Sequence, residues 1–127
     1  MGTSINNSIR LTPYFTVEGA NRFIDYMKNV FNASLVKIDY YADGSVQHGR
    51  LRIDDSVIMF NEAGRDYPSN KSQMHLYVGS VQKTYDLAIR HDSFGVMQPM
   101  RRPHGDLMAG FEDPFGNVWW VAEPSES

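Results

Sequence analysis

Apolar and polar residues follow one another along the chain in patterns that come in a fixed order. Residues 11–17 have the composition of a short strand, and Pro13 within them has no N–H to donate, which predicts a sheet edge or a bulge. Apolar residues then recur at helical spacing over residues 20–31. Three further strands are predicted at residues 35–41, 46–53 and 56–61.

The same order returns in the second half, with a strand at 74–78, a helix at 81–91, and strands at 96–100, 106–112 and 117–122. A shift of 61 positions superposes the two halves, and identical residues then coincide: Val17 with Val78, Asp25 with Asp86, Gly44 with Gly105 and Val57 with Val118. Chance matches between two strand-rich halves are the alternative. The shared order of elements favours an internal repeat.

The repeat predicts one α+β domain made of two βαβββ modules. We place the domain at residues 9–123, with module one at 9–62, a polar connector at 63–72 and module two at 73–123. Residues 1–8 and 124–127 are predicted to be tails. Turns are expected at Asp43-Gly44, as a tight hairpin at Asp54-Asp55, and as a type I turn at Asp113–Gly116.

Composition excludes several classes of function. The chain of 127 residues has no cysteine, which excludes disulfides, thiol nucleophiles and thiolate metal sites. A net charge of −3 without a basic stripe argues against nucleic acid or an anionic membrane as a partner. No apolar run is long enough to span a bilayer and the N-terminus lacks a signal pattern, so a cytoplasmic location is expected.

Several short motifs together resemble one known family. They are Leu11–Tyr14, Asp43–Ile53, His75–Val78, Gly105-Asp106 and, most specific, the Asp-Pro-Phe-Gly-Asn-Val-Trp string at 113–119. They resemble the glyoxalase/bleomycin-resistance/dioxygenase (vicinal-oxygen-chelate) superfamily, and most closely its PhnB-like, glyoxalase-like branch. The resemblance implies a curved mixed sheet around a central cup, helices on the outer face, and a homodimer.

Strand alternation then sorts the side chains between the cup and the helices. Phe15 and Val17 are expected to face a helix, and Trp119 to pack beneath one. The residues expected to face the cup are Thr12, Tyr14, Thr16, Val57, Met59, Asn61, Gln73, His75, Tyr77, Val118, Trp120 and Ala122.

The metalloenzymes of this superfamily hold a divalent ion with four residues, usually His and Glu, on the first, fourth, fifth and eighth strands. The resemblance places these positions at Thr12, Met59, Gln73 and Trp120. Neutral oxygens, a thioether and an indole make a poor site for such an ion. We therefore predict no metal and no cofactor, with a divalent metal at a displaced site as the alternative.

Two histidines are expected near the cup. His75 lies two positions, about 6.6 Å along the strand, from the metal position, and its symmetry mate Tyr14 is expected to be within reach across the cup. A pocket-lining or structural role for His75 is favoured over metal ligation. His48 shares one face of its strand with Arg50 and is a second candidate for the cup. An interpretation as an ordinary half-exposed strand residue fits His48 at least as well.

Aromatic and thioether side chains that would suit a flat or apolar ligand are Tyr14, Met59, Tyr77, Met108, Phe111 and Trp120. The alternative is that they simply fill the cup. The predicted ligand-binding residues are Thr12, Tyr14, His48, Arg50, Met59, Gln73, His75, Tyr77, Met108 and Trp120, and no catalytic residue is assigned.

Three functions compete. The first is a metal-free binder of a small aromatic or apolar molecule, like the drug-sequestering members of the superfamily. The second is a lyase, isomerase or dioxygenase with a displaced metal, or with His75, Tyr14, His48 and Arg50 as acid–base groups. The third is a structural or interaction module, which predicts a cup packed with its own side chains. Whether the modules pair within one chain or across two copies stays open.

Overall fold

The computed structural model describes residues 10–125, so the predicted tail at 1–8 and the last two residues lie outside the described part. The elements of module one are β1 (Tyr14–Val17), α1 (Ala20–Phe31), β2 (Ser34–Tyr40), β3 (Val46–Ile53) and β4 (Ser56–Glu62). Those of module two are β5 (Gln73–Tyr77), α2 (Val81–Arg90), β6 (Phe94–Arg101), β7 (Leu107–Glu112) and β8 (Val118–Glu123).

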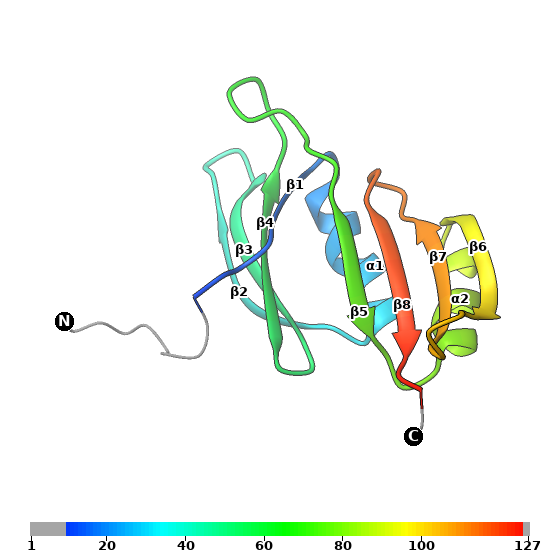
Figure 1. Cartoon of the computed structure of the whole chain (residues 1–127). Coiled ribbons are helices and arrows are strands. Elements are labelled where there is room, and N and C mark those ends of the chain that lie inside the picture. Colours follow the sequence, from blue (N-terminus) through cyan, green and yellow to red (C-terminus); the bar gives the residue numbers. More distant parts are fainter. Residues whose placement is uncertain (1–9, 126–127) are drawn as a thin grey trace.

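The strands form two four-stranded sheets in the orders β1-β4-β3-β2 and β5-β8-β7-β6 (Figure 1). β1 pairs parallel with β4, and β5 pairs parallel with β8. The other neighbouring strands pair antiparallel. Tyr14 lies opposite Met59 in the first sheet and His75 lies opposite Trp120 in the second, and both residues of the second pair follow those of the first by 61 positions. The predicted repeat and α+β fold are confirmed.

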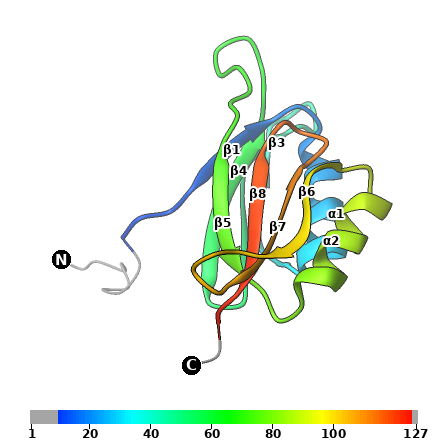
Figure 2. The same ribbon diagram turned by 45° about the vertical axis from the view of Figure 1, so that its right-hand side comes forward.

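Both helices cover the same side of the sheets (Figure 2). The apolar face of α1 is buried, and Asn32 ends the helix in a left-handed conformation with a φ of 57°. Ser80 caps the start of α2, where its hydroxyl accepts a hydrogen bond from the Lys83 amide. Neither helix in the described part of the chain is long and apolar enough to cross a membrane.

The core between the helices and the sheets is aromatic and joins the two modules. The Phe15 ring of β1 stacks on the Trp119 ring of β8 at 5.8 Å, and Phe31 of α1 lies 4.6 Å from the same indole. Phe23 contacts Phe60 at 5.5 Å. The expectation that Phe15 and Trp119 face the helices is therefore confirmed.

Two glutamates at equivalent positions hold the starts of the helices. The Glu62 carboxylate accepts hydrogen bonds from the amides of Gly19 and Ala20 at 2.9 and 2.7 Å, and the Glu123 carboxylate accepts one from Val81 at 2.7 Å. A carboxylate is favourable there because it pairs with free N–H groups at the positive end of the helix dipole. Each glutamate ties the last strand of its module to the helix of the same module.

The predicted edge position of β1 is confirmed, and the connector covers that edge. The Asn70 side chain accepts a hydrogen bond from the Thr16 amide at 2.9 Å and donates one to the Tyr14 carbonyl. The Asn70 amide donates to the Thr16 carbonyl at 3.1 Å. One connector residue therefore satisfies the backbone of β1 in place of a neighbouring strand.

The two hairpins at the ends of the modules differ. Asp54-Asp55 form the predicted two-residue turn, with Ile53 opposite Ser56. In module two the Gly116 amide bonds the Asp113 carbonyl at 3.1 Å, as a type I turn requires, but the loop runs from 113 to 117. Strand β7 is therefore shifted by one residue relative to β3: Gly49 lies opposite Phe60, whereas Gly110 lies opposite Trp120.

Candidate functional site

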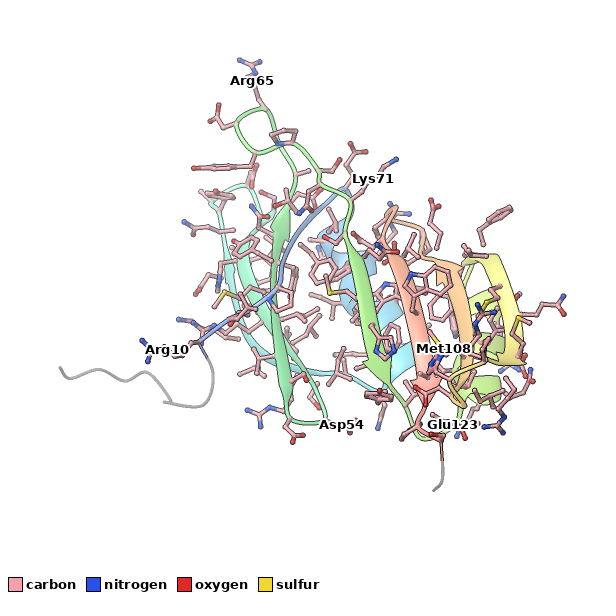
Figure 3. All side chains as sticks on the ribbon, in the orientation of Figure 1. Arg10, Asp54, Arg65, Lys71, Met108 and Glu123 are labelled. Carbon is pink, nitrogen blue, oxygen red and sulfur yellow. The ribbon has the colours of Figure 1, made fainter. Side chains whose placement is uncertain are left out.

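The face of each sheet that points away from the helices is open. Tyr14 on the first sheet is 43% exposed and Tyr77 on the second is 56% exposed, while Phe15 beside Tyr14 is fully buried. Figure 3 places Met108 on the second sheet, and Arg65 and Asp54 at two distant loop tips, away from either face. A cup packed solid with its own side chains is not what the structure has.

The open face of the first sheet carries a hollow of about 610 Å³ that we call the tyrosine basin. It is lined by Tyr14, Thr16, Asp39, Tyr41, Gln47, His48, Asn61 and Tyr67. The Tyr14 and His48 rings lie 5.9 Å apart, and the Thr16 hydroxyl donates to Asn61 at 2.7 Å. Burial, with smaller contributions from Tyr41 and Tyr67, raises the pKa of Tyr14, so this phenol stays protonated at neutral pH.

The open face of the second sheet, which we call the tryptophan face, consists of Gln73, His75, Tyr77, Met108 and Trp120. His75, Trp120 and Gly110 form one row across the sheet. Tyr77, Ala122 and Met108 form the next row. The rings of His75 and Tyr77 meet edge to face at 4.9 Å.

Trp120 is held flat on this face by its neighbours. A side chain on Gly110 would overlap the indole ring, so only glycine lets the ring lie against β7. The indole N–H donates to the Gln73 side-chain oxygen at 2.7 Å. The half-buried indole is therefore fixed in orientation, with His75 beside it and Met108 nearby.

The predicted ligand-binding residues divide between the two sheets. Tyr14 and His48 line the basin, and Arg50 and Met59 lie opposite one another on the same sheet. Gln73, His75, Tyr77, Met108 and Trp120 share the second sheet, while Thr12 precedes β1. Among the described residues the Tyr14 ring pairs with His48 and the His75 ring pairs with Tyr77, so the expected His75–Tyr14 pair is not formed within one chain.

A groove of about 380 Å³ runs between the two sheets. Ile58 of β4 and Met74 and Leu76 of β5 line it, and His75 also contributes to its wall. His75 is thus the one predicted residue that borders both the tryptophan face and this groove.

The expectation that Phe111 lines the cavity is wrong. Phe111 is fully buried and its ring lies 6.1 Å from that of Phe31 on the helix side. Alternation along β7 is the reason, because Met108 and Gly110 occupy one face and Ala109 and Phe111 the other.

The four inherited metal positions do not fit a divalent ion. The Gln73 oxygen already accepts the Trp120 N–H, and an indole offers no lone pair to a metal. Met59 adds only a soft thioether. Within residues 10–125 no three His, Cys, Asp or Glu side chains gather where they would hold an ion.

The 113–119 string has a structural role. Asp113 is buried, and its carboxylate accepts hydrogen bonds from the amides of Phe115 and Asn117 and, at 2.8 Å, from the Trp119 indole. Burial raises the pKa of Asp113, and these hydrogen bonds partly oppose the rise. The string therefore anchors the β7–β8 loop, whose Phe115 ring packs against Phe23 and Tyr26 of α1, away from either open face.

Two repeated βαβββ modules with helices on one side and open sheet faces on the other define a glyoxalase-type fold. Residues 10–121 match the Glyoxalase/Bleomycin resistance protein/Dioxygenase superfamily, and the chain belongs to it. The family expected from the motifs is confirmed. None of the curated proteins matches the chain.

Solved structures share the fold at low identity. TioX from Micromonospora is 18% identical with a TM-score of 0.72, covering 89% of this chain and 94% of TioX. A putative 3-demethylubiquinone-9 3-methyltransferase, a PhnB protein from Bacillus cereus, is 13% identical with a TM-score of 0.75, covering 91% and 100%. Glyoxalase I from Zea mays is 15% identical with a TM-score of 0.73, and the match covers 92% of this chain and 45% of the maize chain.

Proposed function

We propose that this chain binds a small planar aromatic or apolar molecule on the tryptophan face, without a metal ion. The observation that carries the proposal is the Trp120 ring, laid flat over Gly110 with its N–H held by Gln73. A fixed, half-exposed indole offers a stacking surface at little entropic cost to the protein. His75 and Met108 add a hydrogen-bonding and a polarisable contact at its sides.

The proposal includes a homodimer, as in the related family members. Support comes from the tyrosines and sheet edges that a single chain leaves exposed. A cytoplasmic location and the absence of a nucleic-acid partner remain predictions from the sequence.

Calorimetric titration of the protein with planar aromatic probes (acridine, quinoline and naphthoic acid) tests the proposal. We expect saturable binding that EDTA leaves unchanged, with an affinity that Trp120→Ala lowers by about 10-fold or more. Tyr67→Ala, in the basin, is the aromatic control and should keep the affinity. Absence of saturable binding to any probe would overturn the proposal.

The alternative is an enzyme, and the adjacent Tyr14 and His48 rings in the basin favour it. The raised pKa leaves the Tyr14 phenol protonated at neutral pH and makes it a weaker acid, so in this alternative Tyr14 donates a hydrogen bond rather than transferring a proton. Elemental analysis of the purified protein separates the two functions. Stoichiometric metal that is lost in His75→Ala would replace the binding proposal with a displaced metal site.

A further inference from the structure

Strand β2 is one of the two edge strands of the first sheet and pairs only with β3, whereas the other edge, β1, is covered by Asn70. The apolar side chains of β2 are unusually open for a strand: Val36 is 48% exposed and Tyr40 is 52% exposed. An outer strand presents a row of unpaired N–H and C=O groups, which is a template for another strand.

The equivalent strand β6 is closed to such pairing. Pro99 of β6 follows Ile38 of β2 by 61 positions and has no N–H to donate. The β6–β7 register is also interrupted between Met97 and Met100. The β2–β3 register shifts as well, between Leu35 and Lys37 and between Asp39 and Tyr40. The centre of β2 at residues 37–39 nevertheless pairs regularly with β3 and has no proline, so it can still pair with another strand.

The sequence of β2 complements itself about Ile38. If two copies of β2 run antiparallel with Ile38 opposite Ile38, Lys37 of each copy lies opposite Asp39 of the other. Lys37 and Asp39 are on the same face of the strand, with Nζ and Oδ2 3.8 Å apart. Both side chains are more than half exposed and therefore free to reach across.

Charges on β3 favour the same arrangement. Lys37 lies opposite Arg50, and Asp39 lies opposite His48. Like charges directly opposite on neighbouring strands are destabilising, so an acidic residue beside Lys37 relieves its contact with Arg50. Lys37 at the centre of β2 disfavours pairing with an incoming strand that has no acidic residue opposite it. A second copy of β2 places Asp39 there, so the edge is selective for its own copy.

We propose that the second copy of this chain pairs with the first through antiparallel β2 edges centred on Ile38, joining the two first sheets into one. The inference rests on the proposed homodimer and names its interface. Asp39 and Tyr41 line the tyrosine basin, so the interface borders that basin.

Charge reversal tests the interface through the oligomeric state of the full chain, measured by sedimentation equilibrium. Lys37→Asp sets Asp against Asp39 of the other copy, and Asp39→Lys sets Lys against Lys37. Each variant alone should dimerise at least about 10-fold more weakly than the wild type. An equimolar mixture should form a mixed dimer, seen by native mass spectrometry, because opposite charges then face each other again.

The mixture separates pairing between copies from the ion pair within one chain, because neither variant retains that ion pair. Lys83→Asp on α2 makes the same charge change elsewhere and should dimerise like the wild type, and circular dichroism shows that each variant is folded. A wild-type dimer that both reversals leave intact, or variants that do not combine, would overturn the β2 interface alone. A wild type that stays monomeric would overturn the homodimer as well.

Discussion

The two modules share their order of elements and their offset, yet their open faces differ. Module one carries a polar, tyrosine-lined basin, and module two carries a flat tryptophan. The difference follows from the equivalent glycines Gly49 and Gly110. Gly49 makes room for Phe60 on the helix side, whereas Gly110, shifted by one residue, makes room for Trp120 on the open side. One step of register thus turns a core contact into a candidate binding surface.

The largest expected effect concerns the two hairpin turns. Asp113→Ala leaves two buried amides and the Trp119 indole without an acceptor, and should lower the free energy of unfolding by about 3 kcal/mol. Asp55→Ala in the exposed turn of module one should change it by less than about 0.5 kcal/mol. Urea unfolding measures both, and equal losses would contradict the structural role of Asp113.

The glycines test the comparison directly. Gly49→Ala overlaps the enclosed Phe60 ring and should cost about 2 kcal/mol of stability. Gly110→Ala would displace the half-exposed Trp120 indole toward solvent rather than into the core, so it should cost less stability and weaken binding of the aromatic probe instead. Thermal unfolding and probe titration of both variants give the two readouts. The interpretation fails if Gly110→Ala binds like the wild type.

The capping glutamates should also be unequal. The Glu62 carboxylate accepts hydrogen bonds from two amides at the start of α1, where the N-cap residue Gly19 has no side chain to add another. At the start of α2, the N-cap residue Ser80 accepts a hydrogen bond in addition to the one that Glu123 accepts. We expect Glu62→Ala to cost about 1.5 kcal/mol and Glu123→Ala less than about 1 kcal/mol. Chemical denaturation of the two variants side by side checks the order, and a larger loss for Glu123→Ala would reverse it.

The smallest effect is a pH dependence. Since burial raises the pKa of Asp113 above its ordinary 3.8, the folded state holds this proton more tightly than the unfolded state. The contribution of Asp113 to stability is therefore greatest below 3.8 and falls as pH rises through the higher folded pKa. Asp113→Asn should lose this slope when unfolding free energies are compared across acidic pH. If Asp113→Asn keeps the same pH dependence of the unfolding free energy, other groups cause that dependence.

Local patterns predicted most of the fold. Alternation placed Phe15 and Trp119 under the helices and Trp120 on the open face, and the offset aligned both modules. The same alternation along β7 puts Phe111 on the side opposite Met108, which agrees with its burial and not with a place in the cavity. Glu62 and Glu123 are also identical at the offset of 61, and this identity in the sequence marks the residues that hold the starts of the two helices.

The division of the site could not be predicted. Whether Tyr14 meets His75 depends on how two sheets pack over a shared core, which no strand pattern encodes. The register of Gly110 depends on the length of the 113–117 loop, and a turn motif alone does not determine that length. The role of Asn70 is likewise tertiary, because its partners lie on β1.

Calorimetric titration of EDTA-treated protein with the tightest planar probe tests the central claim most directly, with Trp120→Ala and Tyr14→Ala in parallel. The proposed site predicts that the wild type binds without metal, that Trp120→Ala loses affinity by about 10-fold or more, and that Tyr14→Ala keeps it. Full affinity in Trp120→Ala together with loss in Tyr14→Ala, or binding that returns only with a divalent ion, would contradict a metal-free site on the tryptophan face.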